Sequence, residues 1–316
     1  MIIRKIQASQ PDGFWLVTGA AALWGTTGVV TQLIYNIDST TTLFVNLSRL
    51  VIATPVILIA CWQVCGRGMF SIPRRDLLIM ALSGLLMAIS QAAYFAAVPA
   101  AGISIATLLT VCLAPLVVTV LALILKLETL TQRLIFALVC ALIGSALLVS
   151  GGAHQSDGTP FDMPLGSLLA FVSAVTYAGV VICGRFVAER YNPLQITAVN
   201  FSIATLVMIA INAVSGFAPL HTVQGWLLVV YLGFVPTALA YWLLQTGLRS
   251  VSATAASILT MSEPLVAALL AWAIFGETLS LLGIVGAGIL AVSMFFLSEK
   301  SSRANERKPH ARVHDS

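Results

Sequence analysis

Apolar runs long enough to cross a lipid bilayer recur along the whole chain, and this feature limits the possible folds most strongly. A membrane-spanning helix needs roughly 20 consecutive apolar residues. Ten such helices are predicted, at residues 13–34, 41–63, 76–97, 102–125, 132–150, 164–185, 193–215, 223–246, 252–275 and 279–297. The alternation of polar and apolar residues that marks a transmembrane barrel is absent from the sequence. The chain is therefore predicted to be an all-α integral membrane protein with ten transmembrane helices.

Composition supports a membrane protein, because 59% of the residues are hydrophobic and only 9% are charged, against roughly a quarter charged in a soluble domain. The net charge of +4 comes from residues between the spans, so no nucleic-acid partner is predicted.

The cysteines lie within apolar runs and are interpreted as small buried hydrophobic residues. Cys61 and Cys65 share a helix face, but no His or Asp is nearby. Neither a metal site nor a cofactor is predicted.

The basic residues test the number of spans, because the cytoplasmic loops of membrane proteins are enriched in Lys and Arg. With the N-terminus placed inside, every Lys and Arg except Arg49 falls in a predicted inner connection or an inner terminus. If one span were missed or wrongly added, the basic residues of all later loops would fall on the outer side of the membrane. We therefore expect a multi-pass protein of the cell inner (plasma) membrane, with both termini cytoplasmic and the lipid bilayer as its surroundings.

The second half of the chain repeats the first. "APLVVTVLALILKLETL" at 114–130 matches "EPLVAALLAWAIFGETL" at 263–279, which aligns Pro115 with Pro264. "VNLSRL" at 45–50 likewise matches "VNFSIA" at 199–204. Because each half has five spans, the second half must enter the membrane the opposite way round. Such inverted repeats recur in secondary transporters, whose substrate site lies near the bilayer midplane.

The repeat divides the chain into five predicted parts. The first apolar run is too long for a signal-peptide core and is expected to remain as a span. The C-terminal segment is polar and charged, a composition that cannot build a packed core. The parts are a cytoplasmic N-terminus (1–12), a first five-helix repeat (13–150), an external linker (151–163), a second five-helix repeat (164–297) and a disordered cytoplasmic tail (298–316).

These motifs resemble the EamA family of the drug/metabolite transporter superfamily. The resemblance rests on "LWGTTGVV" at 23–30, "LSRLVIA" at 47–53 and the paired "ETL" ends, and it covers about 15–297. It implies a ten-helix carrier, often an exporter of amino acids or other metabolites, with the fifth and tenth helices at the periphery. The second half departs from the pattern, since Ile203 stands where the first half has Arg49.

Glu263 is the most unusual residue, because an ionisable side chain within a membrane span is by default a functional candidate. It lies near the middle of the ninth span and directly precedes Pro264. Its carboxyl is expected either to bind substrate or a proton, or only to fix packing. Pro264 and Pro115 each remove a backbone donor and are predicted to kink matching helices of the two halves. Carbonyl groups exposed in this way can line a binding site.

Arg49 lies inside the second span, where a guanidinium needs a partner or water. Asn46 is one turn earlier on the same face. Two readings stay open for Arg49, a structural clamp and a binding group for a substrate carboxylate. Asn46 and Asn200 are predicted to make interhelical hydrogen bonds. Glu128, in the "ETL" sequence after the fourth span, is predicted to do turn and capping work.

Aromatic and amide side chains complete the predicted site. They lie in spans that the family resemblance places around a central cavity, and could give it apolar walls with a few polar groups or hold an ammonium by cation–π contact. Plain packing is the alternative for each of them. The residues are Trp24, Gln91, Tyr94, Tyr177, Tyr241, Trp242 and Gln245.

The predicted function is secondary active export of a small metabolite by alternating access, driven by a proton gradient or by the substrate gradient. An importer or exchanger of the same fold is the first alternative, and a non-transporting receptor or chaperone is the second. The sequence contains no phosphate-binding loop for ATP, and no enzymatic activity is predicted. Glycines at 283, 286 and 288 allow close helix packing, either within one chain or in a homodimer.

Overall fold

The computed structural model describes residues 13–101, 103–151, 162–275 and 280–306, and over these residues every regular element is helical. The elements are α1 (Gly13–Ile37), α2 (Thr42–Cys65), the short 3-10 helix η2 (Gly66–Phe70), α3 (Arg74–Ala101), α4 (Ile103–Ile124), α5 (Gln132–Gly151), α6 (Met163–Ala188), α7 (Pro193–Ser215), α8 (Val223–Leu232), the π-helix η3 (Gly233–Leu239), α9 (Ala240–Gly247), α10 (Ala253–Thr260), α11 (Glu263–Phe275) and α12 (Leu281–Glu306).

Nine helical segments in the described part of the chain are long and apolar enough to cross a membrane. One of them, Thr42–Phe70, is α2 followed by η2. Two others change in their interior and are called composite here: α8, η3 and α9 form one continuous segment, and α10 with α11 forms another. A further apolar stretch, Leu281–Leu297 within α12, is shorter. The predicted class of an all-α, multi-pass membrane protein is confirmed, and each predicted span coincides with helix.

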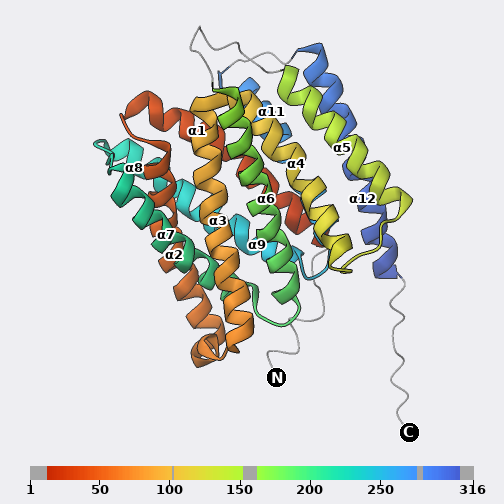
Figure 1. Cartoon of the computed structure of the whole chain (residues 1–316), viewed down its shortest axis with the longest axis horizontal. Coiled ribbons are helices and arrows are strands. Elements are labelled where there is room, and N and C mark those ends of the chain that lie inside the picture. Colours follow the sequence, from red (N-terminus) through yellow and green to blue (C-terminus); the bar gives the residue numbers. More distant parts are fainter. Residues whose placement is uncertain (1–12, 102, 152–161, 276–279, 307–316) are drawn as a thin grey trace.

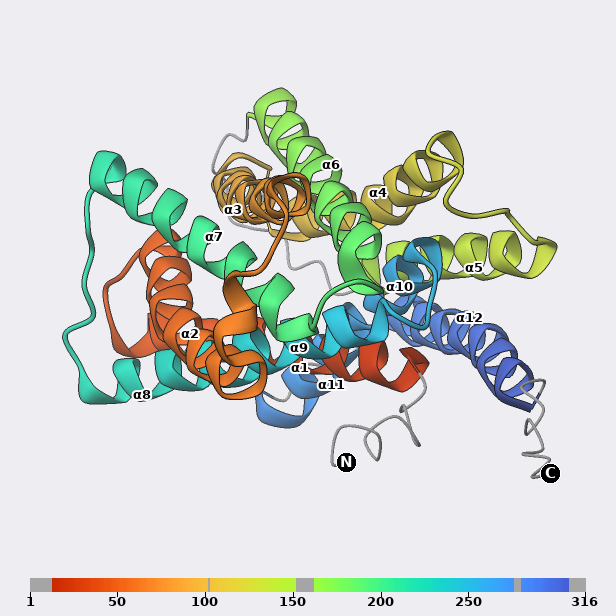
Figure 2. The same cartoon turned by 90° about the horizontal axis from the view of Figure 1, so that it is seen from below.

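The connections between successive helices alternate between two opposite faces of the molecule (Figure 1). We call the face at which α1 begins the N face and the opposite one the far face. The helices pack mainly as α3 on α6, α5 on α12 and α2 on α7. The α5–α12 pair lies at one edge of the molecule (Figures 1 and 2), as the family resemblance implied for the fifth and tenth helices.

Glycine allows the close packing of this edge pair. A side chain at Gly286 of α12 would lie 2.6 Å from the carbonyl oxygen of Gly144 on α5, so only glycine fits there. By contrast, nothing lies within 4 Å of the position that a Cβ would take at Gly288. Gly286 therefore serves packing within the chain, which was one of its two predicted uses.

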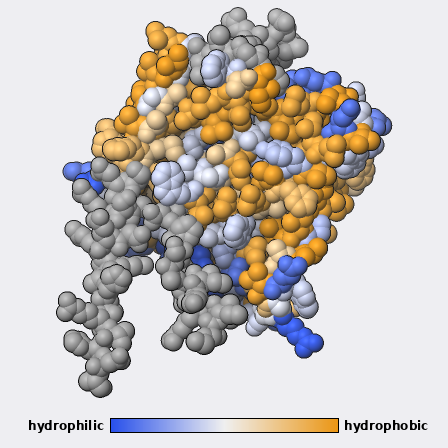
Figure 3. Space-filling model, turned by 180° about the vertical axis from the view of Figure 1, so that it is seen from behind, coloured by the Kyte–Doolittle hydropathy of each residue, from blue (hydrophilic) through white to orange (hydrophobic). Residues whose placement is uncertain are grey.

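The surface separates apolar and charged residues as a membrane protein requires. Apolar side chains cover most of the face seen in Figure 3, and strongly hydrophilic residues lie mainly at its margins. In the described residues, every Lys and Arg other than Arg49 lies at the N face, by its position at a helix end. Asp38, Asp162 and His221 lie at the far face. The predicted segregation of basic residues to one side is thus present in the fold.

The helices around the two prolines of the repeat, Pro115 and Pro264, differ in their continuity. Near Pro264 the helix is interrupted at Met261–Ser262, which separates α10 from α11, whereas α4 continues through Pro115. The two halves therefore differ in this interruption, and the predicted kink at Pro115 stays a prediction.

The difference has a local cause in the hydroxyl groups of the second half. Ser257, Thr260 and Ser262 each donate a hydrogen bond to the carbonyl three residues earlier, at 2.7–2.8 Å. Such side-chain bonds compete with the regular helical pattern. The first-half counterpart of this stretch, "LLTVCLAP" at 108–115, has apolar residues at all three positions.

The eighth predicted span, 223–246, is a helix with a π segment at its centre rather than a regular helix. Pro236 lies inside η3 and cannot donate a backbone bond to the carbonyl of Leu232. The hydroxyl of Thr237 donates to that carbonyl instead, at 2.7 Å. Single π turns frequently occur at functional sites, and this one directly precedes α9, which carries Tyr241.

The last helix is longer than predicted. α12 continues to Glu306, beyond the predicted end of the span at 297. Most of the predicted linker, residues 152–161, and the terminal residues 1–12 and 307–316 lie outside the described residues.

Candidate functional site

Arg49 is held in the interior of the bundle by two neutral amide side chains. It is 6% exposed. Its Nε donates to Oδ1 of Asn46 at 2.8 Å, and its Nη2 donates to Oε1 of Gln91 on α3 at 2.9 Å. These bonds use two of the five N–H groups that a guanidinium offers. Because both acceptors are uncharged, the positive charge is oriented but not neutralised by them.

Glu263 brings a carboxyl group to the same region from the other half of the chain. It is the first residue of α11, immediately after the interruption. As a carboxylate, Glu263 is close enough to interact electrostatically with Arg49. The ion pairs among the described residues are Arg185–Glu189 and Arg190–Asp76, so Arg49 and Glu263 interact without a direct pair. A cation on α2 and a carboxyl on α11 thus approach each other across the two halves.

Tyr241 of α9 lies between these charges and a group of aromatic rings. Its ring centroid is 5.0 Å from that of Trp24 on α1 and 5.3 Å from that of Phe201 on α7, both in edge-on geometry. Its hydroxyl lies beside the amide of Gln91, and its side chain interacts electrostatically with Arg49. Edge-to-face packing stabilises such ring pairs beyond their buried area. Tyr241 therefore connects the oriented guanidinium to an apolar wall.

Two more tyrosines lie in the electrostatic neighbourhood of Glu263. The hydroxyls of Tyr94 and Thr107 lie 2.8 Å apart, and the hydroxyl of Tyr177 lies beside Thr260. Both tyrosines interact electrostatically with Glu263. We call the group formed by Arg49, Gln91, Glu263 and the aromatic residues Trp24, Tyr94, Tyr177 and Tyr241 the central cluster. Its members come from α1, α2, α3, α6, α9 and α11.

The structure thus brings together most residues that the sequence singled out, but not Trp242 or Gln245. No ring contact or hydrogen bond of a described residue joins the Trp242 side chain to the central cluster. Gln245 is buried against Gly184 of α6, and neither polar atom of its amide has a hydrogen-bond partner. Gln245 follows Tyr241 by one turn, but α6 closes over it because Gly184 has no side chain.

The neighbouring asparagines contact other helices, as predicted. Asn46 lies against the sulfur of Met208 on α7, with Nδ2 3.7 Å from Sδ, in addition to accepting from Arg49. The amide of Asn200 on α7 lies 3.1 Å from the hydroxyl of Ser83 on α3. Phe201, Thr107 and Thr260 were not predicted. Their residue types are common in apolar helices, and only the packing of the helices reveals their place.

A surface cavity of about 280 Å³ lies apart from the central cluster. It is formed between α1, α11 and α12. Its lining residues are Phe14, Trp15, Thr18, Leu265, Ala291, Met294 and Phe295. None of the charged residues described above takes part in it. The cavity therefore adds nothing to the chemistry of the central cluster.

Several curated proteins that are similar to this chain are named as transporters. An uncharacterized transporter of Archaeoglobus fulgidus is 29% identical over 264 residues, which cover 83% of this chain and 88% of that protein. The uncharacterized transporter YwfM of Bacillus subtilis is 28% identical, over 88% of this chain and 91% of its own length. The uncharacterized inner membrane transporter YicL of Salmonella typhimurium is 26% identical, over 93% of this chain and 98% of its own length.

A solved structure and a family model complete the comparison. The fold matches a crystal structure with a TM-score of 0.77 at 18% sequence identity, covering 92% of this chain and 98% of the other. At that identity the match shows the fold alone. The fold, the apolar helices and the relatives define a multi-pass membrane transporter. The model of the EamA-like transporter family matches residues 12–150 and 164–299, and the chain belongs to this family.

Proposed function

We propose that this transporter is a secondary active exporter of small zwitterionic metabolites, of which amino acids are the simplest. The observation that carries the proposal is the approach of Arg49 and Glu263 without a direct ion pair. The guanidinium has N–H groups beyond those bonded to Asn46 and Gln91, and these suit a carboxylate. Glu263 and the rings of the central cluster suit an ammonium group. A zwitterion would place its two charges between these two groups.

Alternating access between two inverted five-helix repeats is the mechanism that we propose for this movement. The repeated sequence motifs and the two segments matched by the family model support it. In such carriers the substrate site lies at the repeat interface, where interrupted helices supply backbone groups. Arg49 comes from the first repeat, and Glu263 follows an interruption in the second.

We also propose that the N face is cytoplasmic, in the inner membrane. All described Lys and Arg residues other than Arg49 lie at that face, and basic residues favour the cytoplasmic side. An intramembrane carboxyl can also carry protons, so Glu263 could couple transport to a proton gradient. Export driven by the substrate gradient alone is the alternative for the same site.

Reconstituted protein tests this proposal directly. Proteoliposomes loaded with a panel of radiolabelled amino acids would be diluted into buffer, with and without an imposed proton gradient. Release of at least one zwitterionic compound above the rate of protein-free liposomes is expected. The same assay with matched amino-alcohol and carboxylic-acid analogues, each of which lacks one charge, should show slower release. If anions or cations alone move as well as the zwitterion, the proposed two-charge site is wrong.

A further inference from the structure

Two carboxylates hold the N-termini of the two composite helical segments at opposite faces of the molecule. At the far face, Oδ2 of Asp38 accepts from the backbone N–H groups of His221 and Thr222 and from the Thr222 hydroxyl, all at 2.9 Å. Thr222 is the residue that caps α8. We call this group the far latch. It joins the α1–α2 connection to the start of α8.

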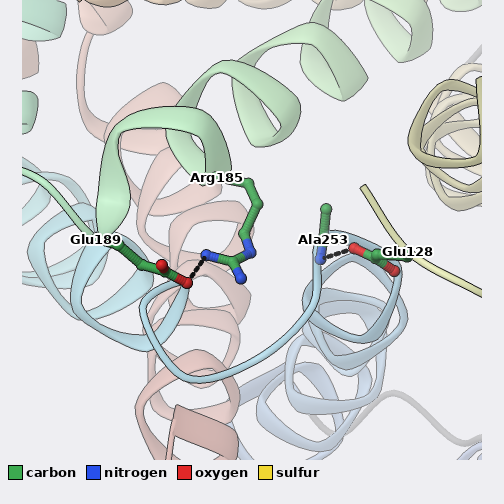
Figure 4. Close-up of polar contacts among 4 residues, drawn as sticks. All are labelled: Glu128, Arg185, Glu189 and Ala253. Atoms are coloured by element: carbon green, nitrogen blue, oxygen red, sulfur yellow. Dashed lines mark hydrogen bonds and ion pairs between the residues drawn. The ribbon is translucent and has the colours of Figure 1, made fainter. Parts of the chain in front are cut away.

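At the N face, Glu128 of the α4–α5 connection binds the start of the other composite segment. Its carboxylate accepts from the backbone N–H of Ala253, and from that of Thr254 at 3.3 and 3.4 Å to its two oxygens. Figure 4 shows this contact beside the Arg185–Glu189 ion pair at the end of α6, a helix that α10 contacts. We call Glu128 with these two N–H groups the N latch.

Each composite segment also has a hydroxyl cap of its own, so the two carboxylates are not its only N-terminal acceptors. The hydroxyl of Thr222 already accepts from Gly225 N at 3.0 Å, and that of Ser252 accepts from Ala255 N at 3.2 Å. Glu128 was predicted to do turn and capping work, and the helix whose first N–H groups it accepts from is α10, whereas Thr131 accepts from Leu134 N at the start of α5. The two carboxylates therefore fix the second half of the chain to connections of the first.

Each latch lies at the start of a composite segment that also carries one residue of the central cluster. From the far latch, α8 passes through the π segment η3 into α9, which carries Tyr241. From the N latch, α10 passes through the interruption into α11, which begins with Glu263. Both composite segments also pack against α1. A movement of the chain that breaks either latch would therefore also displace a residue of the central cluster, because both lie on one composite segment.

On the basis of the alternating access proposed above, we infer that Asp38 and Glu128 are positioning residues that close the two faces in turn. The far latch separates when the far face opens, and the N latch separates when the N face opens. Both latches are formed in the structure. Loss of one latch then favours opening at its own face and disfavours opening at the other.

Hydrogen–deuterium exchange on the full chain in lipid nanodiscs tests this inference without a known substrate. Asp38→Asn should exchange several-fold faster over residues 219–226 and several-fold slower over 251–257, and Glu128→Gln should show the reverse. The slower exchange at the distant latch is decisive, because local loss of a hydrogen bond cannot protect amides at the opposite face. Asp38→Glu and Glu128→Asp, which keep the charge but displace its oxygens, should give smaller shifts in the same directions.

Two control variants match the latches in place and charge. Asp162→Asn removes a far-face carboxylate that caps its own helix through Leu165 N, and Glu189→Gln removes an N-face carboxylate paired with Arg185 on its own helix. Neither should change exchange at the latch of the opposite face. Faster exchange confined to the mutated face, or no change in any latch variant, would overturn the inference. Reciprocal exchange in a protein that moves no substrate would instead count against transport.

Discussion

At the scale of single residues, the hydrogen bond to Gln91 helps to fix the orientation of the Arg49 guanidinium. A buried hydrogen bond to a charged group contributes about 1.5–3 kcal/mol, and the bond from Nη2 to Gln91 is one of the two that orient the guanidinium. Gln91→Leu should therefore weaken substrate binding by about tenfold or more, which corresponds to about 1.4 kcal/mol. Exchange of labelled substrate at varied concentration would measure the change.

The exposed amide of Gln32 on α1, which contacts only Asn36, supplies the control for that experiment. Gln32→Leu should leave the concentration dependence unchanged. If Gln91→Leu also leaves it unchanged, Arg49 is a structural clamp, which was the other reading of this residue. A loss of protein from the membrane in the Gln91 variant alone would support the clamp as well.

Asp38 allows a prediction about pH, because it lies in a connection outside the spans. Burial acts to raise the pKa of Asp38, but the hydrogen bonds from Thr222 and His221, with the charge of His221, together lower it below its ordinary value of 3.8. A carboxyl whose pKa is lower in the folded state stabilises that state above its unfolded pKa, and this stabilisation is lost as the pH falls through the folded pKa. The far latch should therefore stay formed at neutral and mildly acidic pH.

Thermal unfolding of the purified protein at a series of pH values would check this. The difference in Tm between the wild-type protein and Asp38→Asn should not shrink from about pH 7 to pH 5 and should shrink only below about pH 4. A difference that disappears already near pH 6 would show that the carboxyl is not held by these hydrogen bonds.

The sequence singled out every member of the central cluster but could not show which of them are in contact. Arg49 and Glu263 are conspicuous because charges are rare in apolar spans. Gln91 lies 42 residues after Arg49 in the chain, so only the packing of α2 and α3 reveals their bond. Gln245 was assigned to the site because it shares a helix face with Tyr241. The sequence could not show the close approach of α6 at Gly184, against which this amide is buried.

At the scale of elements, the contact between α1 and α11 positions Glu263. A Cβ atom at Gly25 would lie 2.7 Å from Cβ of Val266 and 2.9 Å from the carbonyl oxygen of Glu263. Gly25→Ala should force the two helices apart, at a cost of about 1–3 kcal/mol typical of overpacking. We expect a lower Tm together with a several-fold slower transport rate.

Gly28 on the same helix provides a matched control, since nothing lies within 4 Å of the position that its Cβ would take. Gly28→Ala should keep the transport rate and should not lower the Tm, because alanine favours helix more than glycine does. Equal effects of the two substitutions on transport would mean that the close approach at Gly25 does not set the position of Glu263.

The elements themselves were largely predictable, because an apolar run of spanning length leaves the backbone little choice but helix. What the apolar pattern could not show is where a helix departs from regularity. The π segment depends on the hydroxyl of Thr237 replacing the bond that Pro236 cannot make. The interruption before α11 depends on hydroxyls at 257, 260 and 262 that the first half lacks. Proline alone was a poor guide, as the continuous α4 shows.

At the scale of the whole molecule, charge placement was the most reliable sequence signal. The alternation of basic and non-basic connections predicted which helix ends share a face, and the structure places them accordingly. The contacts between the two halves of the chain could not be predicted from sequence patterns. Asp38 and Thr222 are 184 positions apart, and Glu128 and Ala253 are 125 apart. The same two contacts now connect the two faces of the molecule to its centre.

The central claim is that Glu263, opposite Arg49, binds the transported substrate. Counterflow of a labelled zwitterion in proteoliposomes tests it most directly, with wild-type protein, Glu263→Gln and the surface variant Glu189→Gln compared at equal amounts of folded protein. We predict wild-type counterflow for Glu189→Gln and a loss of counterflow for Glu263→Gln, with an unchanged Tm in detergent. Wild-type counterflow by Glu263→Gln would contradict the account.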